Sequence, residues 1–125
     1  MTLLLNCDLG ESANIESENV DASVMPFIDQ ASIACGFHAG DPDVMAQTLT
    51  YALENKVQIG AHPSYPDREN FGRLSMDLPH QQLIDMIKEQ ISALVNIGKS
   101  LGAEVSYVKP HGALYNDMMA NGHIR

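Results

Sequence analysis

The sequence predicts an α/β fold built on a parallel sheet. Short apolar runs alternate with longer amphipathic segments along the whole chain, and this alternation is typical of βαβ units. Each apolar run also leads into polar, titratable residues, as strands do where they border the functional site of a parallel α/β fold. Four such units would form half of a closed barrel, or a small open sheet.

Four apolar runs predict the strands. Their residues are small and apolar rather than alternating in polarity, which indicates burial on both faces of the sheet. The predicted strands are residues 3–6, 31–35, 57–61 and 105–108.

The segments between the runs predict helices. Asp41 and Pro42 open one of them, because Asp caps free N–H groups and Pro is tolerated at the first helical position. The longest helix starts at Pro79, carries an apolar stripe, and ends at Gly102 as a left-handed cap. Shorter helices are expected at residues 20–28 and 114–120. Residues 62–78 are a long loop, and long loops in compact domains are often functional.

Composition and charge limit the class of protein. The chain has 125 residues, 45% of them apolar, which suits a single domain over residues 1–125 with its own core. Its net charge of −9 disfavours binding to nucleic acid or to an anionic membrane. The apolar runs are too short for a membrane span, and the N-terminus does not resemble a signal peptide. We therefore expect a cytoplasmic protein, in which Cys7 and Cys35 are buried and unpaired.

Titratable side chains lie at or just after every predicted strand. Asn6, Asp8 and Glu11 follow the first strand, His38 the second, His62 the third, and Lys109 and His111 the fourth. The carboxyl ends of parallel strands lie on one side of the fold. We therefore expect Asp8, His38, His62, Lys109 and His111 to converge, although they come from four separate parts of the sequence.

Such a set suits proton transfer or metal binding. Asp and His exchange protons near neutral pH, and Asp8, His38 and His62 are also candidate ligands of a divalent metal. Lys109 can hold a carboxylate or phosphate as a point charge. Arg68 and Arg73 could do the same from the long loop. His80 and His123 lie outside the pattern and are expected on the surface.

Four blocks of the sequence carry a family resemblance. They are LNCDLGE at 5–11, ASIACGFHAGDP at 31–42, IGAHPSYPDRENFGR at 59–73 and VKPHGALYN at 108–116. In these blocks, and in their order and spacing, the chain closely resembles the LamB/YcsF family, whose members are described as the A subunits of 5-oxoprolinase. The resemblance implies an irregular β/α barrel related to the polysaccharide deacetylases.

The resemblance also implies an activity. It implies the ATP-dependent opening of the lactam of 5-oxoproline to L-glutamate, with Mg²⁺ accompanying ATP, and the partner subunits B and C. An older description of the family connects it with lactam utilisation and carbohydrate metabolism. Family members are about twice as long as this chain. The chain would then be the N-terminal half of a barrel, with its second half supplied from elsewhere, for example in a homo-oligomer.

Carried onto this sequence, that activity suggests roles for the strand-end residues. Asp8 and His38 are assigned to proton transfer or water activation, and His62 and His111 to holding the carbonyl or a metal. The candidate substrate-binding residues are Asn6, Glu11, Arg73, Lys109 and Tyr115.

Two other functions stay open. One is a metal-dependent deacetylase or amidohydrolase, which the Asp and His residues at the strand ends would suit. The other is a non-catalytic subunit that binds the substrate and delivers it to partner subunits. Hydrolysis that does not require ATP would favour the first, and ligand binding without turnover would favour the second.

Overall fold

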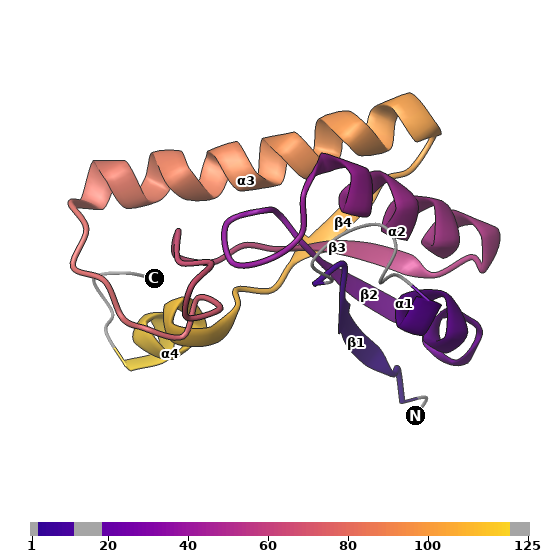
Figure 1. Ribbon diagram of the computed structural model, residues 1–125, viewed down its shortest axis with the longest axis horizontal. Helices are drawn as coiled ribbons and strands as arrows, with labels where there is room; N and C mark the ends of the chain where they lie inside the picture. Colours follow the sequence, from indigo (N-terminus) through magenta and orange to yellow (C-terminus); the bar gives the residue numbers. More distant parts are fainter. Residues whose placement is uncertain (1–2, 12–18, 121–125) are drawn as a thin grey trace.

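A four-stranded parallel sheet forms the centre of the fold (Figure 1). The structure is a computed structural model that describes residues 3–11 and 19–120. The strands β1 (Asn6–Leu9), β2 (Gln30–Ala34), β3 (Gln58–His62) and β4 (Val105–Val108) follow one another across the sheet. The helices are α1 (Asn19–Val24), the short 3₁₀ helix η2 (Met25–Phe27), α2 (Pro42–Glu54), α3 (His80–Leu101) and α4 (Gly112–Ala120). The predicted parallel α/β arrangement is confirmed.

The first strand lies further along the chain than the sequence predicts. The prediction placed it at residues 3–6, but β1 pairs with β2 from Asn6, opposite Gln30, to Leu9, opposite Ile33. Leu3, although apolar, is 86% exposed. Leu9 is instead buried in the core, so the strand continues until this side chain reaches the apolar layer. As a result, Asp8 lies within the strand rather than after it.

The two faces of the sheet differ, which corrects the expectation of strands that are apolar on both sides. Side chains alternate between the faces of a strand. One face packs against the helices and carries the apolar residues Leu9, Ala31, Ile33, Ile59 and Ala61. The alternate positions include Asn6, Asp8, Ser32, His62 and Tyr107. The strands were misjudged because Gly, Ala and Ser occupy several polar-face positions and conceal the alternation.

Tyr107 lies across the polar face of the sheet. Its hydroxyl accepts a hydrogen bond from Asn6 Nδ2 at 2.8 Å and lies 3.0 Å from Ser32 Oγ. The ring can reach these strands because Gly60 leaves room for it: a Cβ atom at residue 60 would lie 2.2 Å from the ring. A single glycine in β3 therefore allows a side chain of β4 to bind β1 and β2.

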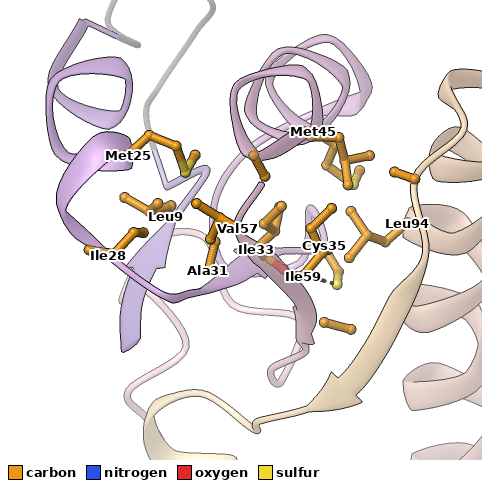
Figure 2. Packing of buried hydrophobic residues seen from close by; sticks show 14 residues of the cluster. Leu9, Met25, Ile28, Ala31, Ile33, Cys35, Met45, Val57, Ile59 and Leu94 are labelled. Carbon is orange, nitrogen blue, oxygen red and sulfur yellow. Dashed lines mark hydrogen bonds between the residues drawn. The ribbon is translucent and has the colours of Figure 1, made fainter. Parts of the chain in front are cut away.

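The main core lies between the sheet and the helices (Figure 2). Ile33 and Ile59 from the sheet meet Met45 and Leu49 of α2 and Leu94 of α3 there. A second, smaller cluster joins the loop before α3, α3 itself and α4; its buried members are Tyr65, Leu83, Met86, Ala113 and Leu114. These two clusters fix the ends of β3 and β4, where the histidines lie.

The helix ends follow the predicted capping. Asp41 accepts a hydrogen bond from the Val44 N–H at 2.9 Å, directly before Pro42. Gly102 ends α3 with a φ of +80°, a left-handed conformation that glycine adopts without steric cost. Within the described ranges, none of the helices has the length and apolar character needed to cross a membrane.

Candidate active site

Glu11, His38, His62 and His111 form one compact cluster at the carboxyl end of the sheet. One ligand atom from each lies within 4.8 Å of those of the other three. His62 is the last residue of β3, and the others lie in the segments that follow β1, β2 and β4. The three histidines are 1–7% exposed. The predicted convergence of the histidines is therefore present in the structure, and Glu11 belongs to the same cluster.

His38 is held from both sides of its ring. Its Nε2 lies 2.6 Å from Glu11 Oε2, and its Nδ1 lies 3.0 Å from Ser64 Oγ. The Ser64 hydroxyl in turn donates to the Tyr65 carbonyl at 2.9 Å. A carboxylate on one nitrogen and a hydroxyl on the other fix the orientation of the ring.

His62 and His111 are each oriented by a backbone carbonyl. Nδ1 of His62 donates to the carbonyl of Lys109, and Nε2 of His111 donates to the carbonyl of Phe71 at 2.7 Å. The remaining nitrogens, His62 Nε2 and His111 Nδ1, face each other at 3.1 Å. Because a carbonyl only accepts hydrogen bonds, these contacts define the tautomer of both neutral rings.

The long loop packs its residues 71 and 72 against the histidines. The rings of His38 and His111 stack with centroids 3.7 Å apart, and the Phe71 ring meets both edge-on. Gly72 has a φ of +68°, and a Cβ atom there would lie 2.9 Å from His38 Cβ. The loop predicted to be functional thus forms a wall of the site.

An open pocket of about 240 Å³ lies beside the cluster. Its lining includes Asp8, His62, Lys109, His111 and Tyr115. Lys109 Nζ lies 2.7 Å from Asp8 Oδ1, and the other Asp8 oxygen lies 3.6 Å from His62 Nε2. Both side chains of this ion pair are about 40% exposed, so a ligand from solvent can reach them.

The surroundings shift the pKa values of the site residues. Burial lowers the pKa of His62 and of His111, against the opposing charges of nearby carboxylates. Burial alone would raise the pKa of Asp8, but the hydrogen bond and charge of Lys109 outweigh it, and the pKa is lowered. Near neutral pH, the pocket therefore presents an ionised carboxylate beside two neutral imidazoles.

Two of the predicted substrate-binding residues lie outside the pocket lining. Asn6 bonds to Gln30, Ser32 and Tyr107 on the polar face of the sheet. Arg73 is exposed, with its guanidinium carbon 5.2 Å from the centroid of the Phe71 ring. In contrast, Lys109 and Tyr115 do line the pocket.

The remaining candidates are placed as follows. Arg68 donates to the carbonyls of Gly36 and Gly40 at 2.9 and 2.6 Å, so it fastens the long loop to the His38 segment. Cys35 is buried and Cys7 only partly buried, and both are free thiols. His80 is exposed, as expected, and His123 lies outside the described residues.

Sequence reasoning missed two residues that support the site. Ser64 orients His38, and Gln90 of α3 in turn holds Ser64: it accepts from the Ser64 N–H at 2.9 Å and donates to the Ser64 carbonyl at 2.8 Å. Gln90 is fully buried. A signal was available, because Gln90 lies four residues from both Met86 and Leu94 in the apolar stripe, and a buried amide needs partners.

Comparisons with known proteins identify the family. The family model described as the LamB/YcsF family matches residues 3–124. The chain belongs to the LamB/YcsF family.

Relatives within the LamB/YcsF family have been given functional names. The chain is 59% identical over 119 residues to a protein of Pseudomonas putida that is named as a 5-oxoprolinase A subunit, the second of that name; the match covers 95% of this chain and 46% of that protein. It is 53% identical over 123 residues to a 5-oxoprolinase A subunit of Vibrio cholerae, a match that covers 98% of this chain and 50% of that protein.

A solved structure has the same fold. The crystal structure of a lactam utilization protein from Thermus thermophilus matches with a TM-score of 0.93 and 35% identity. The match covers 99% of this chain and 50% of that one. The chain therefore spans about half the length of the LamB/YcsF relatives that it matches, in line with the prediction that it forms about half of a larger unit.

Proposed function

We propose that this chain forms part of the A subunit of an ATP-dependent 5-oxoprolinase, which hydrolyses the lactam of 5-oxo-L-proline to L-glutamate. The observation that carries this proposal is the 59% identity, over nearly the whole chain, to a protein named as a 5-oxoprolinase A subunit. The name of the solved relative, a lactam utilization protein, points to the same substrate class. Subunits B and C are the proposed partners.

The chemistry of the pocket is compatible with this reaction. A lactam is a stable amide, and transfer of a phosphoryl group from ATP, with Mg²⁺, to the amide oxygen would activate it. Water then adds to the ring carbon, the C–N bond breaks, and the products are glutamate, ADP and phosphate. The protein has to hold a small carboxylate, place a water molecule and move protons.

Asp8 and Lys109 are the pocket residues best placed for these tasks. The Asp8 carboxylate is ionised and open to solvent, so it can accept a proton from the attacking water. Lys109 Nζ lies beside it and can hold the substrate carboxylate or a phosphoryl oxygen. His62 lies 3.6 Å from Asp8 and can receive the proton next. His38 does not line the pocket, so we assign it to positioning rather than to contact with the substrate.

The test is glutamate release from 5-oxoproline, with and without ATP, after the chain is mixed with subunits B and C. We expect release only with ATP. Asp8→Asn should lower the rate by about 100-fold or more, the range of a lost general base, and leave the circular dichroism spectrum unchanged. Asp77→Asn, in the exposed part of the long loop, is the matched control.

The other outcomes point to different functions. Glutamate release without ATP would contradict the proposal and favour a metal-dependent amidohydrolase. Binding of 5-oxoproline with no turnover in any subunit mixture would favour a substrate-binding role. Near-normal activity of Asp8→Asn would overturn the role given to Asp8 and leave the reaction itself standing.

A further inference from the structure

The cluster of three imidazoles and one carboxylate has an unbalanced arrangement of hydrogen-bond donors and acceptors. His62 Nδ1 and His111 Nε2 both donate to backbone carbonyls, which use the single N–H of each neutral ring. His62 Nε2 and His111 Nδ1 are then both bare, yet they lie 3.1 Å apart. Two lone pairs at this distance repel each other unless a proton or a cation lies between them.

His38 and Glu11 repeat this arrangement on the other side of the cluster. The Ser64 hydroxyl directs its hydrogen at the Tyr65 carbonyl, so its oxygen can accept the Nδ1–H of His38. In that tautomer His38 Nε2 is bare and faces Glu11 Oε2 at 2.6 Å. Glu11 Oε2 is also 3.6 Å from His111 Nδ1. Four acceptor atoms, three of them on buried rings, therefore point at one volume.

We propose that Glu11, His38, His62 and His111 together bind one divalent transition-metal ion, for which Zn²⁺ is the best match. Three imidazole nitrogens and one carboxylate oxygen are a donor set that suits Zn²⁺, whereas Mg²⁺ prefers oxygen ligands. Ligands at about 2.0–2.1 Å in a tetrahedral site lie about 3.3 Å apart. The observed separations of 2.6, 3.1 and 3.6 Å lie on either side of that value.

The surroundings of the cluster also fit a metal site. Metal-binding histidines usually donate their second ring N–H to a carbonyl, a carboxylate or another polar oxygen, which fixes the tautomer. Here the Lys109 and Phe71 carbonyls and the Ser64 hydroxyl occupy those positions. Gln90 holds Ser64 from behind through two hydrogen bonds to its backbone. The rings are thus held with their free nitrogens inward before any ion binds.

This proposal adds a metal to the site of the proposed function but does not depend on the lactam reaction. His62 and His111 belong both to the cluster and to the pocket lining, so the ion would border the bound substrate. When bound, it would polarise a carbonyl or acidify a water molecule. Because titration with Zn²⁺ measures binding without substrate, failure of the metal site can be told apart from failure of the proposed function.

The test is calorimetric titration of the chelator-treated chain with Zn²⁺ alone and, separately, with Mg²⁺ alone. We expect one Zn²⁺ ion per chain, and no Mg²⁺ binding of comparable affinity at this site. Co²⁺ substituted for Zn²⁺ should give the intense visible absorption of a four-coordinate ion. Absence of Zn²⁺ binding to the folded chain would overturn the proposal and assign the space between the rings to a shared proton.

Variants locate the ion. Glu11→Gln keeps the side-chain shape but removes the charge, and His111→Gln removes a nitrogen ligand. Each should weaken Zn²⁺ binding by more than the roughly 10–100-fold that follows the loss of an outer partner such as Ser64. The matched control is His80→Gln, an exposed histidine at the start of α3, which should leave the affinity unchanged. Zn²⁺ binding that survives Glu11→Gln and His111→Gln with full affinity, in chains shown by circular dichroism to be folded, would overturn the assignment.

Discussion

At the scale of single residues, the site depends on polar side chains that are buried yet fully used. Gln90 is 0% exposed, and its amide contacts both the N–H and the carbonyl of Ser64. Ser64 in turn contacts His38. One side chain of α3 thereby controls a ring that it does not touch. A buried amide tolerates few substitutions, because losing it strands its partners away from water.

Gln90→Leu should therefore destabilise the protein, although leucine has a similar volume. The Ser64 N–H and carbonyl would lose their partner, and each buried group left unsatisfied costs about 1–3 kcal/mol. We expect the free energy of unfolding to fall by about 3 kcal/mol, measured by urea denaturation. Gln82→Leu, at an exposed position of the same helix, should change it by less than about 0.5 kcal/mol. Equal effects of the two substitutions would contradict this account of Gln90.

The cysteines give a second prediction at this scale. Burial raises the pKa of Cys35 to about 11 and also raises that of Cys7. Only the thiolate reacts with alkylating reagents, and at pH 8 about one Cys35 in a thousand would be ionised. In the folded protein we expect Cys35 to resist iodoacetamide at pH 8 and the partly buried Cys7 to react first. The rates should rise with pH and become equal in denaturant, as mass spectrometry of each cysteine peptide can show. Faster labelling of Cys35 would show that the strand end is less closed than its burial indicates.

At the scale of secondary-structure elements, contacts across the sheet fix the register of the strands. The ring of Tyr107 lies on Gly60 of the neighbouring strand and reaches Asn6 and Ser32 beyond it. This contact joins the last strand to the first two. It lies on the polar face, so it acts in addition to the apolar layer beneath the helices.

Gly60→Ala should break this arrangement through sterics alone. The new methyl group would overlap the Tyr107 ring at 2.2 Å, and overpacking of this kind costs about 1–3 kcal/mol or more. Gly102→Ala is the control: its Cβ would meet no atom within 4 Å, but its φ is +80°, so it should cost only about 1 kcal/mol. Thermal denaturation of both variants measures the difference. A larger loss for Gly102→Ala would contradict the close packing of Tyr107 on β3.

At the scale of the whole molecule, the sheet has two open edges. In the part of the chain that the structure describes, β1 and β4 each pair with one strand only. Val108, at the end of β4, is 48% exposed, and Tyr115 of α4 is 45% exposed. The relatives that the chain matches are about twice as long, and unpaired edges beside apolar side chains favour association with another chain.

We accordingly expect the 125-residue chain, purified by itself, to self-associate as its concentration rises. Sedimentation velocity over a range of concentrations measures this. Val108→Lys should weaken the association, because a lysine on an edge strand opposes pairing. Lys88→Arg, at an exposed position of α3, should leave it unchanged. A sample that stays monomeric at every concentration would show that these edges are not adhesive.

The sequence by itself determined the order of the elements, the parallel sheet, the caps of α2 and α3, and the gathering of the histidines. These follow from local patterns and from one rule of topology, that parallel strands end on the same side. Only the tertiary structure decided that β1 runs from Asn6 to Leu9, that the sheet has a polar face, and that Glu11 belongs with the histidines. It also revealed Ser64 and Gln90 as supports. The physical reason is that register, ring orientation and hydrogen-bond partners depend on atoms distant in sequence: Gln90 lies 26 residues from Ser64, and no local pattern specifies which buried group it will meet.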